Sequence, residues 1–419
     1  MLQCPQVEPE VKKMYDLLLK GGTVIDPLRS LHEKLDVGIT GDRITGLATT
    51  IGASEATRVI DVSGKLVTPG LVDNHVHVYP SKPSSKHPDF AGVCGGVTTA
   101  ADAGGAGPNN FQDFCYSVLN QSQTRLYCLL SIFRDRGAEA MKKRAADSAD
   151  GWDMDIDGVV KLAREYPDVV KGIKVQLSFR ESKAIGIKHI EAAKVASRKA
   201  NIPVLMHLSD TAGREMGITS PQMVGQAVSL MDPGDAITHV FTPNSGSILD
   251  QDGKVLPEVF DAQRRGVFID TANDGNNFGW AEAEMVMSQG LVPDIIASDN
   301  QITYKPTLLR SLLEYSSFYL HLGFSVDDVV RMMTIAPARF LHIEDRAGSL
   351  SLGRDADIAV LELLDGQWQL EDSTGVCRTG SEALVPVLTI KSGRVIESGE
   401  GLYPWGWAPP TVAAPGVPV

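Results

Sequence analysis

The sequence predicts an α/β protein, namely a (β/α)₈ TIM barrel with a small β-sandwich domain formed from both chain ends. Three observations predict this fold. Apolar strands alternate with helical patterns over residues 65–346, as in a parallel α/β sheet. Short β patterns without a long helix lie on both sides of that region. The length of 419 residues is enough for one large domain and a smaller one.

The β-sandwich is predicted from the two ends of the chain. After a loose leader, short β patterns separated by Gly-Gly, Gly-Asp and Ser-Gly turns run from residue 15 to 61. Similar patterns return at 353–361 and 387–396. We therefore assign residues 1–64 and 347–419 to one domain, with an extended Pro- and Ala-rich tail from residue 405.

The barrel is predicted from eight strand candidates between which helical patterns lie. Helical patterns are clearest at 182–200, 220–231 and 278–289, and those at 307–322 and 325–341 would close the outer ring. A region of this length suits such a barrel, whose typical size is roughly 250 residues. The strand candidates are residues 66–78, 97–103, 125–132, 170–177, 202–207, 236–241, 266–271 and 294–299.

Charge and cysteine content restrict the partners and the compartment. Lys and Arg total 39 against 52 Asp and Glu, and this net charge of −13 argues against nucleic acid and anionic membranes as partners. A small-molecule substrate is expected, and a homo-oligomer through a β edge or helix face is left open. Five widely spaced cysteines indicate free thiols, and no apolar run is long enough to span a membrane, so we expect a cytoplasmic protein.

Reactive side chains are expected at the carboxyl ends of the strands, which meet at one face of a barrel. His75 and His77 end the first strand and point the same way, because side chains alternate along a strand. The other polar residues at such ends are Lys174 on strand 4, His207 on strand 5, His239 on strand 6 and Asp299 on strand 8.

These side chains suit a metal centre. Four neutral imidazoles and a carboxylate are ligands for Zn²⁺ or a similar first-row metal. A lysine ammonium would repel a dication, but a neutral amine at Lys174 can take up CO₂ as a carbamate, which would bridge two metals roughly 3.5–4 Å apart. The site could therefore hold two divalent metal ions, Zn²⁺ first, with a carbamate on Lys174. Lys171 is the rival, disfavoured because it precedes the apolar core of its strand.

Other residues near the strand ends are candidates for substrate contact. Arg180 follows strand 4 and could hold a carboxylate, with a solvated arginine as the equal alternative. Asn273 and Asp274 follow strand 7, and His87 lies in the loop after strand 1. His189, on an amphipathic helix, is expected to be solvated.

Several segments resemble the amidohydrolase superfamily, in its two-metal subgroup with a carboxylated lysine, which includes dihydroorotases and hydantoinases. The resemblance covers nearly the whole chain. Residues 96–107 and 172–175 are similar to a group described as amidohydrolase/deacetylase or dihydroorotase-like. The segments shared with the wider superfamily are Val-Thr-Pro-Gly-Leu-Val-Asp-Asn-His-Val-His (67–77), Thr-Ile-Ala-Pro-Ala-Arg-Phe-Leu (334–341) and Gly-Ser-Leu-Ser-Leu-Gly-Arg-Asp-Ala-Asp-Ile (348–358).

The resemblance implies a role for each ligand. His75, His77 and Asp299 would bind the more buried metal, His207 and His239 the more exposed one, and carboxylated Lys174 both. A metal-bridging hydroxide would attack the substrate carbonyl, and Asp299 would take its proton and pass it to the leaving group. The implied activity is hydrolysis of an amide C–N bond or a related ester of a small molecule, with an N-acyl compound (deacetylase or amidase) leading.

Three alternatives remain at this point. The first is a cyclic amidase of the dihydroorotase, hydantoinase or lactamase type. The second, a one-metal deaminase, is disfavoured because Lys174 is present and no glutamate closely follows His207. The third, a non-catalytic scaffold, is disfavoured because all six ligands are present. Asn273 stands where the nearest relatives carry a histidine, so the substrate stays open.

Overall fold

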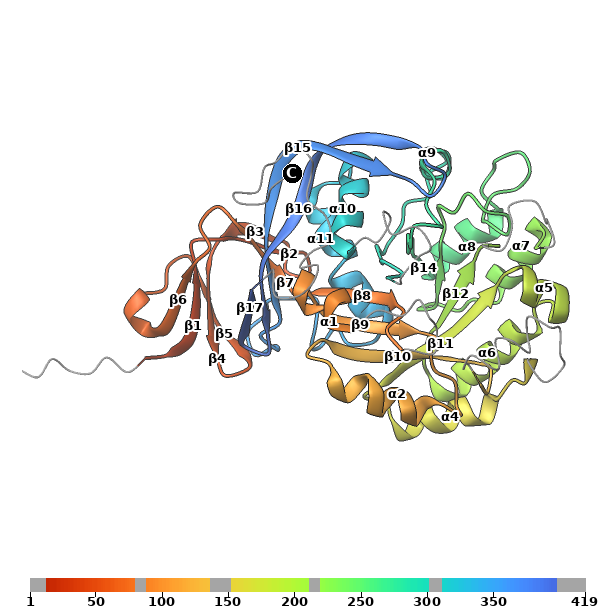
Figure 1. Ribbon diagram of the computed structural model, residues 1–419, viewed down its shortest axis with the longest axis horizontal. Coiled ribbons are helices and arrows are strands. Elements are labelled where there is room, and N and C mark those ends of the chain that lie inside the picture. The colour runs from red at the N-terminus through yellow and green to blue at the C-terminus, as the bar shows by residue number, and fades with distance from the viewer. Residues whose placement is uncertain (1–12, 80–87, 136–151, 211–218, 301–310, 398–419) are drawn as a thin grey trace, which may run out of the picture.

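A seven-stranded parallel sheet forms the centre of the computed structural model, which describes residues 13–79, 88–135, 152–210, 219–300 and 311–397 (Figure 1). Its strand order, β14-β13-β12-β11-β10-β9-β8, follows the chain in reverse, as expected for successive βα units. The strands are β8 (Leu71–Val76), β9 (Val97–Ala103), β10 (Arg125–Ser131), β11 (Val170–Leu177), β12 (Val204–Leu208), β13 (Ala236–Thr238) and β14 (Phe268–Ile269).

The sheet curls so that both of its edges border one further segment. Single parallel bridges join Ile295 to Asp270, beyond β14, and Asn300 to Val76 at the end of β8. This segment includes the eighth strand candidate, 294–299. It therefore lies between the two edge strands, although it forms no regular strand of its own.

Helices cover the outside of the curled sheet. Several begin at serines whose side chains accept a hydrogen bond from a backbone N–H of the first turn, as Ser220, Ser311 and Ser325 do. The helices are α1 (Pro88–Ala91), α2 (Phe111–Ser117), α4 (Ile156–Glu165), α5 (Phe179–Ile185), α6 (Lys188–Ala200), α7 (Pro221–Ser229), α8 (Pro257–Arg265), α9 (Trp280–Ser288), α10 (Leu312–His321), α11 (Val326–Met332) and α12 (Ile335–Phe340).

Two predicted helices are each divided into two shorter helices. The pattern at 182–200 is split at Gly186 into α5 and α6, and that at 325–341 is split at Thr334 into α11 and α12.

The prediction that His189 is solvated was wrong, because this residue of α6 is buried. Its Nε2 lies 2.8 Å from the carbonyl oxygen of Gln176, and its ring stacks on Phe133.

The chain ends form two further sheets, one from N-terminal strands alone and one from strands of both ends. The two sheets share one apolar core that includes Leu19, Val37, Val67 and Ile358. The extent of the end domain and its boundaries at 64 and 346 stay predictions. One sheet has the order β5 (Arg43–Ala48), β4 (Asp36–Thr40), β1 (Tyr15–Lys20), β6 (Ala56–Asp61). The other has the order β17 (Arg394–Glu397), β16 (Cys377–Lys391), β15 (Ile358–Glu371), β7 (Leu66–Pro69), β2 (Thr23–Asp26), β3 (Leu31–Lys34).

The strand predicted at 66–78 is divided at Gly70. Its first part, β7, pairs with β15 in the end domain, and its second part, β8, begins the parallel sheet. A Cβ at residue 70 would stand 2.2 Å from Oγ1 of Thr98, so the chain passes from one sheet to the other where a side chain would not fit.

Strands β15 and β16 form a long hairpin that the sequence did not predict in full. Only 353–361 and 387–396 were expected as strands. The hairpin leaves the end sheet and runs across the top of the barrel region to α9 (Figure 1). Its buried residues Trp368, Leu370, Ala383 and Leu384 belong to the same apolar core as the parallel sheet. In the part of the chain that the structure describes, no helix is long and apolar enough to cross a membrane.

Candidate active site

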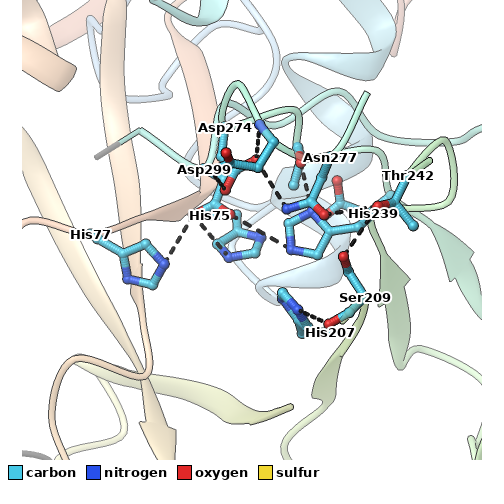
Figure 2. Close-up of polar contacts among 12 residues, drawn as sticks. His75, His77, His207, Ser209, His239, Thr242, Asp274, Asn277 and Asp299 are labelled. Atoms are coloured by element: carbon cyan, nitrogen blue, oxygen red, sulfur yellow. Dashed lines mark hydrogen bonds and ion pairs between the residues drawn. The ribbon is translucent and has the colours of Figure 1, made fainter. Parts of the chain in front are cut away.

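Three predicted metal ligands meet at the ends of β8 and of the eighth strand segment. Nε2 of His77 lies 2.9 Å and Nε2 of His75 lies 3.5 Å from Oδ1 of Asp299 (Figure 2). All three side chains are buried, and one ligand atom from each lies within 4.8 Å of the others. This spacing suits three ligands of a single metal ion.

The other three predicted ligands join the same cluster. Nζ of Lys174 lies 2.6 Å from Nε2 of His75. Nε2 of His239 lies 3.6 Å from Oδ2 of Asp299, and the His239 ring centre lies 4.3 Å from that of His207. Lys174 is buried, whereas Lys171 extends over the ring of Tyr127 at 5.5 Å from its centre. The structure therefore brings all six residues together and places Lys171 elsewhere.

Hydrogen bonds fix which imidazole nitrogens remain available for a metal. Nδ1 of His239 donates to the carbonyl oxygen of Ala272 at 2.6 Å, which leaves the lone pair on Nε2. That Nε2 is buried and has no hydrogen-bond partner among the described residues. Nε2 of His207 lies 3.1 Å from the carbonyl oxygen of Ser209, which leaves Nδ1 for a metal. A buried acceptor without a donor is costly, so the donor set fits a bound cation.

Burial controls the protonation of the cluster. It lowers the pKa of His239 to about 4, and it lowers the pKa of His75 and His207 well below the ordinary value. Burial opposes ionisation of Asp299, but His75 and His77 outweigh it and hold the pKa of this carboxyl well below its usual range. Neutral imidazoles beside a carboxylate are the forms that bind metal.

The backbone is strained at the same place. Positive φ angles occur at His239 (69°), Ala272 (36°), Asp274 (41°) and Asp299 (47°), a conformation that non-glycine residues rarely adopt. Such residues often cluster at functional sites, where the surrounding structure holds them.

A hydrogen-bonded network of polar side chains borders the cluster. Asn277 donates from Nδ2 to Oδ1 of Asp274 at 3.0 Å and accepts from Oγ1 of Thr242 at 2.9 Å (Figure 2). The hydroxyls of Thr242 and Ser209 lie 3.1 Å apart, and Asn244 donates to the Ser209 hydroxyl at 3.1 Å. Sequence reasoning named only Asp274 of this network. Polar residues shortly after strands 5, 6 and 7 were a signal, but ordinary turns carry the same residue types.

The predicted substrate contacts have different surroundings. Asn273 is buried and accepts a hydrogen bond from the hydroxyl of Tyr319 at 3.0 Å. Asp274 is buried as well, and burial first, then nearby Asp299, raises the pKa of its carboxyl well above the ordinary value. Arg180 is exposed near the start of α5. His87 lies outside the described residues. The roles of all four as substrate contacts stay predictions.

Asp102 organises the loops beside two ligands. Its Oδ2 accepts hydrogen bonds from the backbone N–H groups of Val78 and Tyr79, both at 3.0 Å, directly after His77. Its Oδ1 accepts from the N–H of Gly105 at 2.7 Å. Asp102 thus caps a turn and also supports the backbone directly after His77.

The chain is similar to known proteins in sequence and in fold. The sequence profile described as Amidohydrolase family matches residues 66–396. A deacetylase of Enterococcus faecalis is 28% identical over 394 residues, which cover 92% of this chain and 100% of the relative. The crystal structure of an adenine deaminase has a TM-score of 0.80 at 28% identity and covers 91% of this chain and 100% of that chain. The crystal structure of a dihydroorotase has a TM-score of 0.77 at 25% identity, with 91% and 97% covered.

Proposed function

Because the chain belongs to the amidohydrolase family and is a hydrolase acting on C–N bonds, we propose that it cleaves the amide bond of a small N-acyl compound, or a related ester. The observation that carries this proposal is the buried meeting of six ligands, with Lys174 Nζ 2.6 Å from His75 Nε2. The similarity to a deacetylase over nearly the whole of both chains supports an acyl group as the part removed.

The proposed scaffold is a closed (β/α)₈ barrel with a β-sandwich built from both chain ends. The single bridges from Ile295 and Asn300 to the two edges of the parallel sheet support closure. In such a barrel the carboxyl ends of the strands carry the reactive groups. Five of the six proposed ligands lie at or just beyond such ends, and Lys174 lies within β11.

Two divalent ions, Zn²⁺ first, are proposed at this site. His75, His77 and Asp299 would hold one ion, His207 and His239 the other, and a carboxylated Lys174 both. Ions bound there would lower the pKa of a coordinated water and polarise a substrate carbonyl. The orphaned Nε2 of His239 supports this set, because without a cation a buried acceptor would stay unsatisfied.

Asp299 is proposed as the catalytic base. Its carboxyl is held ionised, so it can accept the proton of the attacking water. It would then give that proton to the leaving nitrogen as the C–N bond breaks, which yields an acid and an amine. Asn273, Asp274, Arg180 and His87 are proposed to contact the rest of the substrate. The net charge of −13 supports a small molecule as the partner.

Two other substrate classes are kept as alternatives. Cyclic amides are supported by the similarity to a dihydroorotase structure. Deamination is supported by the similarity to an adenine deaminase structure, and it is disfavoured by Lys174 at the centre of the cluster.

A hydrolysis screen on Zn²⁺-loaded protein tests the proposal. The panel contains N-acyl amino acids, acyl esters, cyclic amides and adenine, with His75→Ala as the blank and His32→Ala, an exposed residue outside the cluster, as the folded control. Turnover of linear acyl compounds alone supports the proposal. Ring opening alone, or ammonia release from adenine alone, would replace it with one of the alternatives.

A further inference from the structure

The tip of the long hairpin, residues 372–376, lies against the start of α9. Oδ2 of Asp372 accepts a hydrogen bond from the backbone N–H of Trp280, the first residue of that helix, at 3.0 Å. The residue before the helix is Gly279, which has no side chain to cap it. Asp372, 92 residues away along the chain, therefore satisfies an N–H group that the helix itself leaves open.

Three further hydrogen bonds hold the same contact. The backbone N–H and the hydroxyl of Ser373 both donate to the carbonyl oxygen of Phe278, at 2.9 and 2.8 Å. The indole N–H of Trp280 donates to the carbonyl oxygen of Leu370 at 3.1 Å. The chain just before α9 is thus joined to the hairpin through a buried carboxylate, a hydroxyl and the backbone.

Packing reinforces the contact. The ring of Trp280 stacks on Phe318 of α10 at 5.0 Å between centres, and the guanidinium of Arg378 in β16 lies 5.0 Å from the Trp280 ring centre. Arg378 also pairs with Glu284 of α9. Aromatic and cation–π contacts thus stabilise the packing of α9 against α10 and the hairpin.

The segment between this contact and the ligand cluster is the site loop, residues 273–279. At its near end, the N–H of Asp274 donates to the carbonyl oxygen of Ser298 at 3.0 Å, directly before Asp299. In its middle, Asn277 joins Asp274 to Thr242. At its far end, the hairpin tip holds Phe278. One short loop thus connects the end-domain hairpin to the backbone beside a metal ligand.

We propose that Asp372 and Ser373 are positioning residues that set the site loop, and with it the affinity for substrate. Neither touches the ligand cluster, so they act through Phe278 and the start of α9. This places part of the specificity of the barrel in the end domain. The role of the site loop in substrate contact rests on the proposed function, whereas the mechanical link between hairpin and loop does not.

The variant Asp372→Asn is designed to remove the hydrogen bond between the hairpin and α9 while the turn at the hairpin tip is kept. Oδ1 of Asp372 accepts from the N–H and hydroxyl of Thr374 and from the N–H of Val376, and these bonds shape the turn. The amide oxygen of the substituted side chain would serve those three donors, so its NH₂ group would face the N–H of Trp280, which would lose its acceptor. Thr374→Val, which removes only a hydroxyl inside the turn, is the matched control.

Hydrogen–deuterium exchange on the full-length protein is the first readout. In Asp372→Asn we expect the site loop and the first turn of α9 to exchange about tenfold faster, the effect of losing roughly one hydrogen bond to a charged group. Residues 372–376 should keep their protection, and Thr374→Val should match the wild type in the loop. Unchanged exchange of the site loop in Asp372→Asn would overturn the proposal, even if no substrate had been found.

Steady-state kinetics with a substrate from the hydrolysis screen is the second readout. Asp372→Asn and Ser373→Ala should each raise KM severalfold while kcat and bound Zn²⁺ stay within about twofold, because the ligands do not move. Loss of metal, or an equal fall in kcat and kcat/KM, would show that the hairpin merely supports the fold and would contradict the positioning role. A wild-type protein without turnover would count against the proposed function and leave the exchange result standing.

Discussion

A Cβ atom at Gly104 would lie 2.9 Å from Cγ and 3.0 Å from Cβ of Lys174, so the backbone of one residue packs directly against the stem of the other. Gly104 also has a φ of +78°, which favours glycine. Its neighbour Gly105 donates to Asp102, which supports the backbone after His77. One short loop therefore borders Lys174 and the strand that leads to His75 and His77.

Gly104→Ala is expected to displace Lys174 and to lower metal content. The methyl group would crowd the lysine stem, and the positive φ would add strain of about 1–3 kcal/mol. Metal per chain is measured by elemental analysis beside the free energy of unfolding. Gly290→Ala is the control, because Gly290 has a φ of +90° and open space around its Cβ position. If both variants lose equal stability and both retain metal, crowding of Lys174 does not cause the loss of stability in Gly104→Ala.

Lys174→Ala should remove the bridging ligand, while Lys171→Ala should not. We expect the wild type to hold two metal ions, Lys174→Ala to hold one or none, and turnover to fall by at least about 100-fold. Lys171 contacts Tyr127 and serves as the matched control on the same strand. Native mass spectrometry checks the modification, since an added CO₂ should be seen in wild type and Lys171→Ala only. Two metals and full activity in Lys174→Ala would refute the assignment.

The convergence of the six side chains could be predicted because it depends on few assumptions. Parallel strands end at one edge, so polar residues such as His207 and His239 at those ends must meet once the strands are identified. The strands were identifiable because both faces of a parallel sheet are buried and its strands are continuously apolar. No prediction of loop conformation was needed.

Features that depend on distant contacts could not be predicted. The hydrogen bond from Tyr319 to Asn273 depends on where α10 packs, so the sequence did not reveal it. Residues 362–386 alternate weakly and contain Gly366 and Pro386, and the burial of Trp368 in the apolar core of the parallel sheet is a distant contact that the sequence did not reveal. His189 looked solvated because helical periodicity does not reveal which neighbour covers a helix face.

Arg125→Met should destabilise the protein more than a matched change at the surface. Arg125 begins β10 and pairs with Asp355 at 2.8 Å and Asp357 at 3.1 Å, two buried carboxylates of the end domain. Removing the partner of a buried charge costs several kcal/mol when no other cation replaces it. Here Arg346 still pairs with Asp355 and Lys391 with Asp357, so we expect Arg125→Met to lower the free energy of unfolding by about 1–3 kcal/mol. Urea unfolding measures this free energy. Arg198→Met, which removes a surface pair with Asp232, should cost less than about 1 kcal/mol, and an equal cost for both would refute the argument.

Asp36 should make the free energy of unfolding depend on pH in the acid range. Burial alone would raise the pKa of its carboxyl, but hydrogen bonds from the N–H groups of Ile51 and Gly21 at 2.8 Å, and from Lys20 at 2.9 Å, hold the pKa below the ordinary value of 3.8. A carboxyl with a lower pKa in the folded state binds its proton more weakly there than in the unfolded chain. Its contribution to stability is therefore fully present above pH 3.8 and disappears as the pH falls through the lower folded value.

The variant Asp36→Asn tests this dependence. Near pH 7 it should be less stable than the wild type, because its NH₂ group cannot accept a hydrogen bond and it has no charge to pair with Lys20. The difference in free energy of unfolding between the two proteins should then narrow as the pH drops below 3.8. Denaturant titrations at a series of pH values measure it. A difference that stays constant across the acid range would mean that Asp36 keeps the same pKa in the folded and unfolded states, and that its hydrogen bonds stabilise the fold without linkage to pH.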